Sequence, residues 1–396
     1  MEDLPDGIYF DLPHDIYVAL PRMGSTGVKD MICSTATFWH RSWLNKNRPS
    51  DDLPKRDPKS IGTAYHMAQL EPDRFRETYA RGFDPSEHID DDDGGFLATD
   101  TAVCEVLKDL GETQRKKGES ALDRAYRLAE IAPQYNIAAI LEAEHIEDNF
   151  GKILLPPDLW SQAEFTMKLM QTDPSVVTCL SGGFAEVTIL WTSDNGVKMR
   201  ARIDYLTAHR WCDLKTFSNP LRKPVDVLIN NAFRFNGYMS QAALYDEGVE
   251  QIRRGNLQVK WYHDGGVSEL SNLDESWSAL AMIEKIRAMK SPLLCFFVFV
   301  QSDGSPNILT RQVLLRDYID GHDVNGAGVD DDTLPEFMTK ATQVLTRGRM
   351  DVDRARRLFL WGEAAFNSDE PWLPDRAVGT IDEDCFNPHY LEGFEN

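Results

Sequence analysis

The segment from Phe184 to Thr216 constrains the fold more than any other part of the chain. Phe184–Trp191 (FAEVTILW) is rich in β-branched and aromatic residues, and Val197–Leu206 (VKMRARIDYL) alternates between apolar and polar positions, as strands do. The tripeptide Asp194-Asn195-Gly196 lies between them, and Asn-Gly between two such runs is the strongest short signal for a β-hairpin. Trp211–Thr216 (WCDLKT) follows a short turn at 209–211. The segment therefore predicts a meander of three consecutive strands.

Helical patterns on both sides of this meander set the fold class. Apolar residues at helical spacing predict a helix over 59–82, and they predict mostly helical structure from 99 to about 171, with breaks at Pro133 and at Pro156–Pro157. A long helix is predicted from about Pro224 to Val249, further strands at Leu257–Tyr262, Leu293–Val300 and Asn307–Leu315, and a last helix at about Leu334–Trp361. This order predicts an α/β (or α+β) fold with a mixed central sheet flanked by helices.

One domain is expected to account for most of the 396 residues. Residues 1–58 are rich in Pro, Asp and Gly, which predicts an irregular N-terminal arm with one short helical stretch near Val28–Leu44. Residues 59–396 form the predicted domain, with a mostly helical insertion at about 83–180 and a C-terminal helical extension from about 334.

Composition excludes some protein classes and opposes others. No run of about 18 apolar residues is present, so no membrane span is expected, and the acidic start without a signal pattern predicts a cytoplasmic protein. The six cysteines form no C-x-x-C pair, which argues against a zinc ribbon and favours buried free thiols. A net charge of −22 opposes nucleic-acid binding, because phosphate contacts need Lys and Arg. The charge is uneven, however, since 347–357 (RGRMDVDRARR) is basic.

Asp213, Lys215 and Asp204 form the pattern that points to chemistry. Residues i and i+2 of a strand share one face, so Asp213 and Lys215 project together while Leu214 points into the core. Asp204 lies on the preceding strand and is placed to approach Asp213. Carboxylate oxygens suit Mg²⁺ or Mn²⁺, and such ions stabilise the charge that develops in phosphodiester hydrolysis. A D-x-K pair on a strand is also a common surface pattern, so it does not identify a function by itself.

Four other residues are candidates for the same site. His66, on the predicted helix over 59–82, is a possible neutral imidazole ligand, although a lone helical histidine is more often structural. Glu186 lies on the first strand of the meander, where an outward-facing carboxylate is the simpler interpretation. Gln241 and Tyr245 share one face of the long helix at i, i+4 spacing.

Taken in order, these pieces resemble the exonuclease VIII (RecE-like) branch of the PD-(D/E)XK nuclease superfamily, a group of phage and prophage recombination exonucleases. The resemblance runs from about residue 7 to 250, and Ile203 stands where the family often has proline before the first aspartate. The matching stretches are Gly62–His66 with Leu70–Pro72, Glu186–Trp191, Arg202–Asp204, Asp213–Thr216, Gln241–Tyr245 and the opening Ser25–Phe38.

This resemblance implies a role for each candidate residue. His66, Asp204 and Asp213, with the backbone carbonyl of Leu214, would bind Mg²⁺ or Mn²⁺, and Lys215 would be the catalytic lysine. Supporting roles fall to Glu186, Gln241 and Tyr245. The resemblance further implies a homo-oligomer that degrades double-stranded DNA from its ends, with 5′ to 3′ polarity expected, and that works with a single-strand annealing protein in a bacterial cytoplasm.

Three alternatives remain open at this stage. The same residues could serve an endonuclease or a repair nuclease. The charge of −22 motivates a non-catalytic interaction protein that retains the nuclease fold, or an acidic metal enzyme acting on a small phosphorylated substrate.

Overall fold

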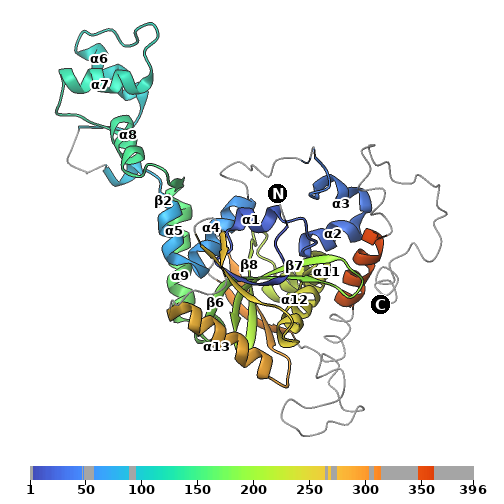
Figure 1. Cartoon of the computed structure of the whole chain (residues 1–396). Helices are drawn as coiled ribbons and strands as arrows, with labels where there is room; N and C mark the ends of the chain where they lie inside the picture. Colours follow the sequence, from blue (N-terminus) through green and yellow to red (C-terminus); the bar gives the residue numbers. More distant parts are fainter. Residues whose placement is uncertain are drawn as a thin grey trace.

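A mixed sheet forms the centre of the computed structural model (Figure 1), which describes residues 3–46, 48, 58–88, 95–263, 266–268, 274–302, 307–313 and 347–360. Eight strands of the described residues make up this sheet. Neighbouring strands run antiparallel except for two pairs, β1 with β9 and β8 with β11, which are parallel. The expected mixed sheet is therefore confirmed. Its strands, in spatial order, are β10 (Gly266–Ser268), β9 (Val259–His263), β1 (Gly7–Phe10), β6 (Gly183–Thr192), β7 (Lys198–Thr207), β8 (Arg210–Phe217), β11 (Leu294–Gln301) and β12 (Ile308–Val313).

The predicted meander is strands β6, β7 and β8. β6 and β7 are paired from Gly183↔Thr207 to Thr192↔Lys198, and the Asp194-Asn195-Gly196 turn joins them. The next pair of strands behaves differently, because β7 and β8 are paired only at Tyr205↔Cys212 and Leu206↔Trp211. Beyond these two pairs the strands diverge, and we call this divergence the fork.

Helices cover both faces of the sheet. The main core packs under α2 (Ser25–Cys33), α12 (Tyr238–Arg253) and α13 (Asp274–Ala288), where Trp211 and Phe297 are buried. Cys212 and Leu214 alternate with Trp211 along β8, so they face the opposite side, where they pack with Met170 and Val176. The helices on that side are α4 (Pro58–Leu70), α9 (Pro157–Thr172) and α10 (Pro174–Cys179).

Three elements differ from the prediction. The expected long helix at 224–249 is two helices, α11 (Val225–Phe235) and α12, because Gly237 has φ +71° and interrupts the helical backbone. Helix α13 was not expected. Strand β1 lies inside the sheet between β9 and β6, although residues 1–58 were expected to be an irregular arm. The same N-terminal region also contains α1 (His14–Ala19) and α3 (Thr35–Arg41).

A projecting segment occupies part of the predicted insertion. Residues 82–152, which we call the outer arm, extend away from the body (Figure 1). The arm is rooted on a parallel strand pair, and residues beyond that root, including α9 and α10, pack back onto the body. The root strands are β2 (Tyr79–Arg81), which follows α5 (Pro72–Thr78), and β5 (Ile153–Leu155). The arm contains η1 (Pro85–His88), β3 (Phe96–Leu97), α6 (Asp100–Asp109), α7 (Ala121–Ile131), β4 (Asn136–Ile137) and α8 (Ala138–Asp148).

Three further expectations concern the C-terminal extension, the cysteines and membrane spans. Residues 347–360 are helical, while the rest of the extension predicted from about 334 lies outside the described residues. Five cysteines are described; all are free thiols, and only Cys33 is exposed. None of the helices in the described ranges has the length and apolar run that crossing a bilayer requires.

Candidate active site

The candidate site lies at the fork between β7 and β8. Where the two strands stop pairing, the Asp204 carboxylate takes the place of a backbone acceptor: the Leu214 N–H donates to Asp204 Oδ2 at 2.6 Å. The N–H and C=O of one strand residue point toward the same neighbouring strand. The Leu214 carbonyl, predicted as a metal ligand, is therefore also directed toward this gap.

A histidine and two carboxylates meet on the β7 side of the fork. Helix α4 places His66 between Asp204 of β7 and Glu186 of β6. The His66 Nε2 atom lies 2.9 Å from Asp204 Oδ2, and its Nδ1 atom lies 3.3 Å from Glu186 Oε1. The ligand atoms of these three residues all lie within 4.8 Å of one another. Two carboxylate oxygens and an imidazole nitrogen are a donor set that fits a divalent ion.

The backbone at Glu186 is in an unusual conformation. Its φ is +55°, in the left-handed region that costs about 1–3 kcal/mol for a residue other than glycine. Phe184 and Val187 both face the main core, so the strand advances three positions between core residues instead of two. On β7, Ile203 and Leu206 also face the main core three positions apart. Ile203 pairs with Val187, and Leu206 pairs with Phe184. This shared kink sets Glu186 opposite Asp204, a placement of like charges that a bound cation would relieve.

Asp213 and Lys215 share a face of β8, as the sequence predicts. The Asp213 carboxylate is fully buried, with Oδ2 2.5 Å from Lys215 Nζ and Oδ1 accepting a hydrogen bond from Gln241 Nε2 at 2.7 Å. Lys215 Nζ also lies 5.2 Å from the centre of the Tyr238 ring, a cation–π distance. Asp213 thus orients the lysine, and Gln241 of α12 holds Asp213 in place.

The predicted metal-ligand set and the observed cluster differ in one member. The close group contains Glu186, which was predicted as a supporting residue, whereas Asp213 is engaged by Lys215 and Gln241. Tyr245 is also placed behind the site. It is 6% exposed, packs edge-on against Trp211 and hydrogen-bonds to Gln241.

The charges of the site are set by burial and by one another. Burial opposes the charge on His66, but Asp204 and Glu186 outweigh it and raise the pKa of His66 to about 9. Burial likewise opposes the charge on Asp204, yet His66 and Lys215 lower its pKa below the usual value. Burial raises the pKa of Glu186, and burial raises the pKa of Asp213 to about 7. Without a metal, the protonated histidine is therefore the cation between the two carboxylates.

Arg202 is a site residue to which the sequence assigned no role. It is buried, with Nε 3.4 Å from Glu186 Oε2 and 3.1 Å from Thr188 Oγ1, and its Nη2 donates to the Leu12 carbonyl. Tyr17 of α1 lies 4.6 Å from its guanidinium carbon. Arg202 precedes Asp204 by two positions and so shares its face, which is the signal that could have identified it.

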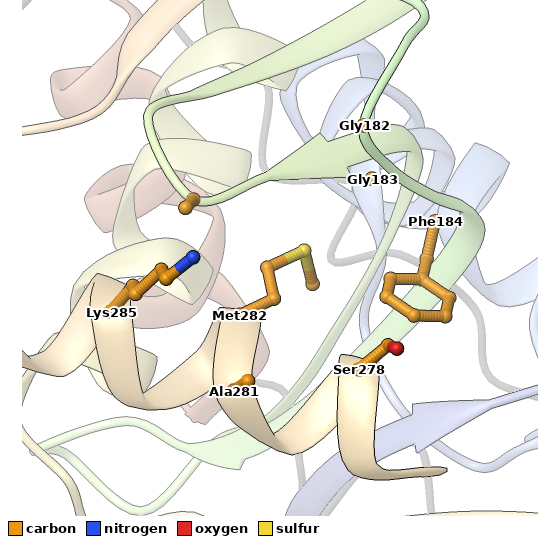
Figure 2. Close-up of a pocket in the computed structure, with 8 residues that line it drawn as sticks. Gly182, Gly183, Phe184, Ser278, Ala281, Met282 and Lys285 are labelled. Atoms are coloured by element: carbon orange, nitrogen blue, oxygen red, sulfur yellow. The ribbon is translucent and has the colours of Figure 1, made fainter. Parts of the chain in front are cut away.

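The cavity shown in Figure 2 lies elsewhere, between α13 and the start of β6. Its volume is about 370 Å³, and none of its lining residues carries a carboxylate. It therefore lacks the carboxylates that usually bind Mg²⁺ in proteins. Its lining residues are Gly182, Gly183, Phe184, Ala208, Ser278, Ala281, Met282 and Lys285.

Comparison with known proteins identifies the domain. No curated protein matches the chain. One similar solved structure is a candidate exonuclease from Eubacterium rectale, 14% identical, with a TM-score of 0.28, covering 64% of this chain and 73% of that one. Residues 43–262, which contain every site residue named above except Leu12 and Tyr17, match the PDDEXK-like domain of unknown function (DUF3799). The match spans more than half of the chain, which therefore belongs to this family of PDDEXK-like domains.

Proposed function

We propose that the protein is a metal-dependent DNA exonuclease that degrades duplex DNA from its ends. The observation that carries this proposal is the fork, which gathers Asp204, Asp213 and Lys215 beside His66 and Glu186. Carboxylates, an imidazole and an oriented lysine are the groups that phosphodiester hydrolysis needs. Membership of a PDDEXK-like family supports the same chemistry.

The two sides of the fork have different proposed roles: the β7 side would bind the metal, and Lys215 on the β8 side would contact the phosphate or the water. His66, Glu186 and Asp204 would hold Mg²⁺ or Mn²⁺, with Asp213 and the Leu214 carbonyl within the same gap. When bound, such an ion stabilises negative charge on a phosphate and lowers the pKa of water. Lys215, held by Asp213, is 18% exposed, so its ammonium can reach a phosphate oxygen or the attacking water. Arg202 keeps Glu186 in position.

The proposal has a finer form that rests on the sequence resemblance. We place the protein in the exonuclease VIII branch, with 5′ to 3′ polarity, a homo-oligomeric assembly and a role in making single-stranded DNA for an annealing protein during phage or prophage recombination in the cytoplasm. Sedimentation of the purified chain tests the oligomer. Co-purification with an annealing protein tests the partner.

Linear duplex DNA labelled at one 5′ end tests the activity. We expect the full chain to degrade it with Mg²⁺ and not with EDTA, and the label released first reports polarity. Lys215→Ala should abolish degradation, while Lys285→Ala, at an exposed lysine on α13, should behave as wild type. Cleavage of closed circular DNA would instead assign an endonuclease. If every DNA form stays intact with Mg²⁺ or Mn²⁺, the non-catalytic alternative replaces this proposal.

A further inference from the structure

Exposed apolar side chains line the turn where the outer arm returns to its root, between α8 and β5. Phe150, in the turn after α8, is 92% exposed, and Ile146, one helical turn earlier, is 50% exposed. Ile153, three residues after Phe150 at the start of β5, is 40% exposed. These three residues, which we call the apolar tip after the α8–β5 turn that carries them, lie close together in the chain on either side of Gly151, whose positive φ of +84° turns the backbone. A phenylalanine this exposed gains no burial on folding, and a group of exposed apolar side chains rimmed by charged residues marks an interaction site.

The segment that contains the apolar tip is strongly acidic. Residues 82–152 contain 17 Asp and Glu against 7 Lys and Arg, a net charge of −10 out of −22 for the chain. Helix α8 alone carries Glu142, Glu144, Glu147 and Asp148, all exposed. Among the described residues, no cation forms an ion pair with any of these four.

The arginines of the arm are used internally instead. Arg124 pairs with Asp100 at 2.9 Å, and Arg127 pairs with Glu119 at 2.7 Å, while Arg115 also reaches Asp100. These pairs surround a small separate core formed by Leu97, Val103, Leu107, Ala125, Leu128, Ala132 and Ile137. At the root, His145 of α8 contacts the Arg81 carbonyl at 2.7 Å. The arm is thus a built structure whose arginines are paired with its own carboxylates, while the carboxylates of α8 remain exposed.

We propose that the outer arm is a protein-docking module, in which the apolar tip enters a recess on a partner protein of net positive charge. The carboxylates of α8 would surround that recess and pair with the partner's Lys and Arg. Charge complementarity selects this occupant. Nucleic acid is disfavoured because its phosphates would be repelled. A second copy is disfavoured because the chain outside the arm is itself net acidic, with 47 Asp and Glu against 35 Lys and Arg.

This inference stands apart from the proposed nuclease activity. It gives a role to a segment that carries nearly half of the net charge and that is joined in the chain to the site helix α4 through α5 and β2. Because the arm projects from the body (Figure 1), the body could approach DNA while the acidic arm contacts a protein. Long-range electrostatic attraction would accelerate the encounter with a basic partner, and the apolar tip would supply most of the affinity.

Photo-crosslinking of the full-length protein tests the inference. A photoreactive phenylalanine analogue at position 150, introduced in cells that encode the protein, should crosslink one protein of net positive charge, identified by mass spectrometry. The matched control places the analogue at Trp277, an exposed aromatic on α13, and should not capture that protein. Crosslinks only to a second copy, only to nucleic acid, only to an acidic protein, or to nothing would overturn the proposal.

Binding of the purified partner gives the quantitative test. Phe150→Ser should weaken binding by at least about tenfold, as for a central interface anchor. Glu144→Lys with Glu147→Lys should weaken it further as charge attraction becomes repulsion, and the wild-type affinity should fall with added salt. Trp277→Ser should bind as wild type. Nuclease activity on naked DNA should be the same in Phe150→Ser and wild type, so failure of docking and failure of catalysis are measured separately. Unchanged binding in Phe150→Ser would refute the proposal.

Discussion

Replacing Lys215 by methionine should destabilise the protein mainly at alkaline pH. The Asp213 carboxylate is fully buried, and Lys215 Nζ at 2.5 Å is its cation. Methionine keeps an unbranched, flexible side chain but removes the ammonium. Burial already raises the pKa of Asp213 to about 7 with the lysine present, and loss of the lysine must raise it further.

The size of the effect follows from proton linkage. Below pH 7, folded Asp213 holds its proton in both proteins, so the lysine contributes little through this pair. Above pH 7 the wild-type carboxyl ionises, whereas the folded variant keeps a proton that its unfolded chain releases. Each pH unit above 7 then costs the variant about 1.4 kcal/mol, or about 3 kcal/mol by pH 9. Breaking a buried ion pair by removing one partner typically costs about 3–5 kcal/mol.

Urea unfolding with EDTA at pH 6 and pH 9 measures this difference. The gap in the free energy of unfolding between wild type and Lys215→Met should widen from pH 6 to pH 9. Adding Asp213→Asn should remove most of the widening, because the asparagine does not ionise. Lys285→Met serves as the control at an exposed lysine. A gap of equal size at both pH values, or one that Asp213→Asn leaves unchanged, would refute the reasoning.

The remaining predictions concern the cluster and the break between α11 and α12. Because His66 has a pKa of about 9 without metal, Mg²⁺ or Mn²⁺ binding should release its proton, and affinity should rise from pH 6.5 to 9. Calorimetry in buffers of different ionisation enthalpy detects this release, and pH-independent binding would contradict it. Glu186→Gln should weaken metal binding at least about tenfold, and it should also lower the pKa of His66. A proton NMR titration measures the pKa of His66. An unchanged pKa would show that the two side chains are not coupled. Gly237→Ala should cost about 1–2 kcal/mol in urea unfolding, because φ is +71° and the new Cβ would lie 2.7 Å from Lys29 Cγ. If Gly237→Ala is as stable as wild type, the backbone at position 237 changes conformation without cost, and the reasoning is wrong.

Local rules were sufficient to predict the meander and one half of the site. The Asn195-Gly196 turn fixes how β6 meets β7, and the two-residue period of a strand puts Asp213 and Lys215 on one face, as the structure confirms. The helix break at Gly237 has a local signal in Asn236-Gly237, although one continuous helix was predicted there.

Other features depend on contacts between distant parts of the chain. Strand β1 has four residues, too few for a periodic signal, and it becomes a strand because β6 and β9 supply partners on both sides. Glu186 appears on its strand as an ordinary outward carboxylate, and only the kink that it shares with β7 turns it toward Asp204. The predicted insertion at about 83–180 includes both the outer arm and the helices α9 and α10 that pack on the body, because nothing local distinguishes helices that pack on the sheet from helices that project.

The left-handed backbone of Glu186 makes this position informative about relatives of the protein. Glycine would relax the backbone there, and asparagine would tolerate it better than most residues do. Selection for stability alone would therefore replace glutamate, and only a need for its carboxylate opposes that drift. In a relative that has lost its chemistry, position 186 is where we expect glycine or asparagine to appear early, alongside changes at His66 or Asp204. This single residue thus offers a way to separate working members of the family from decayed ones by sequence.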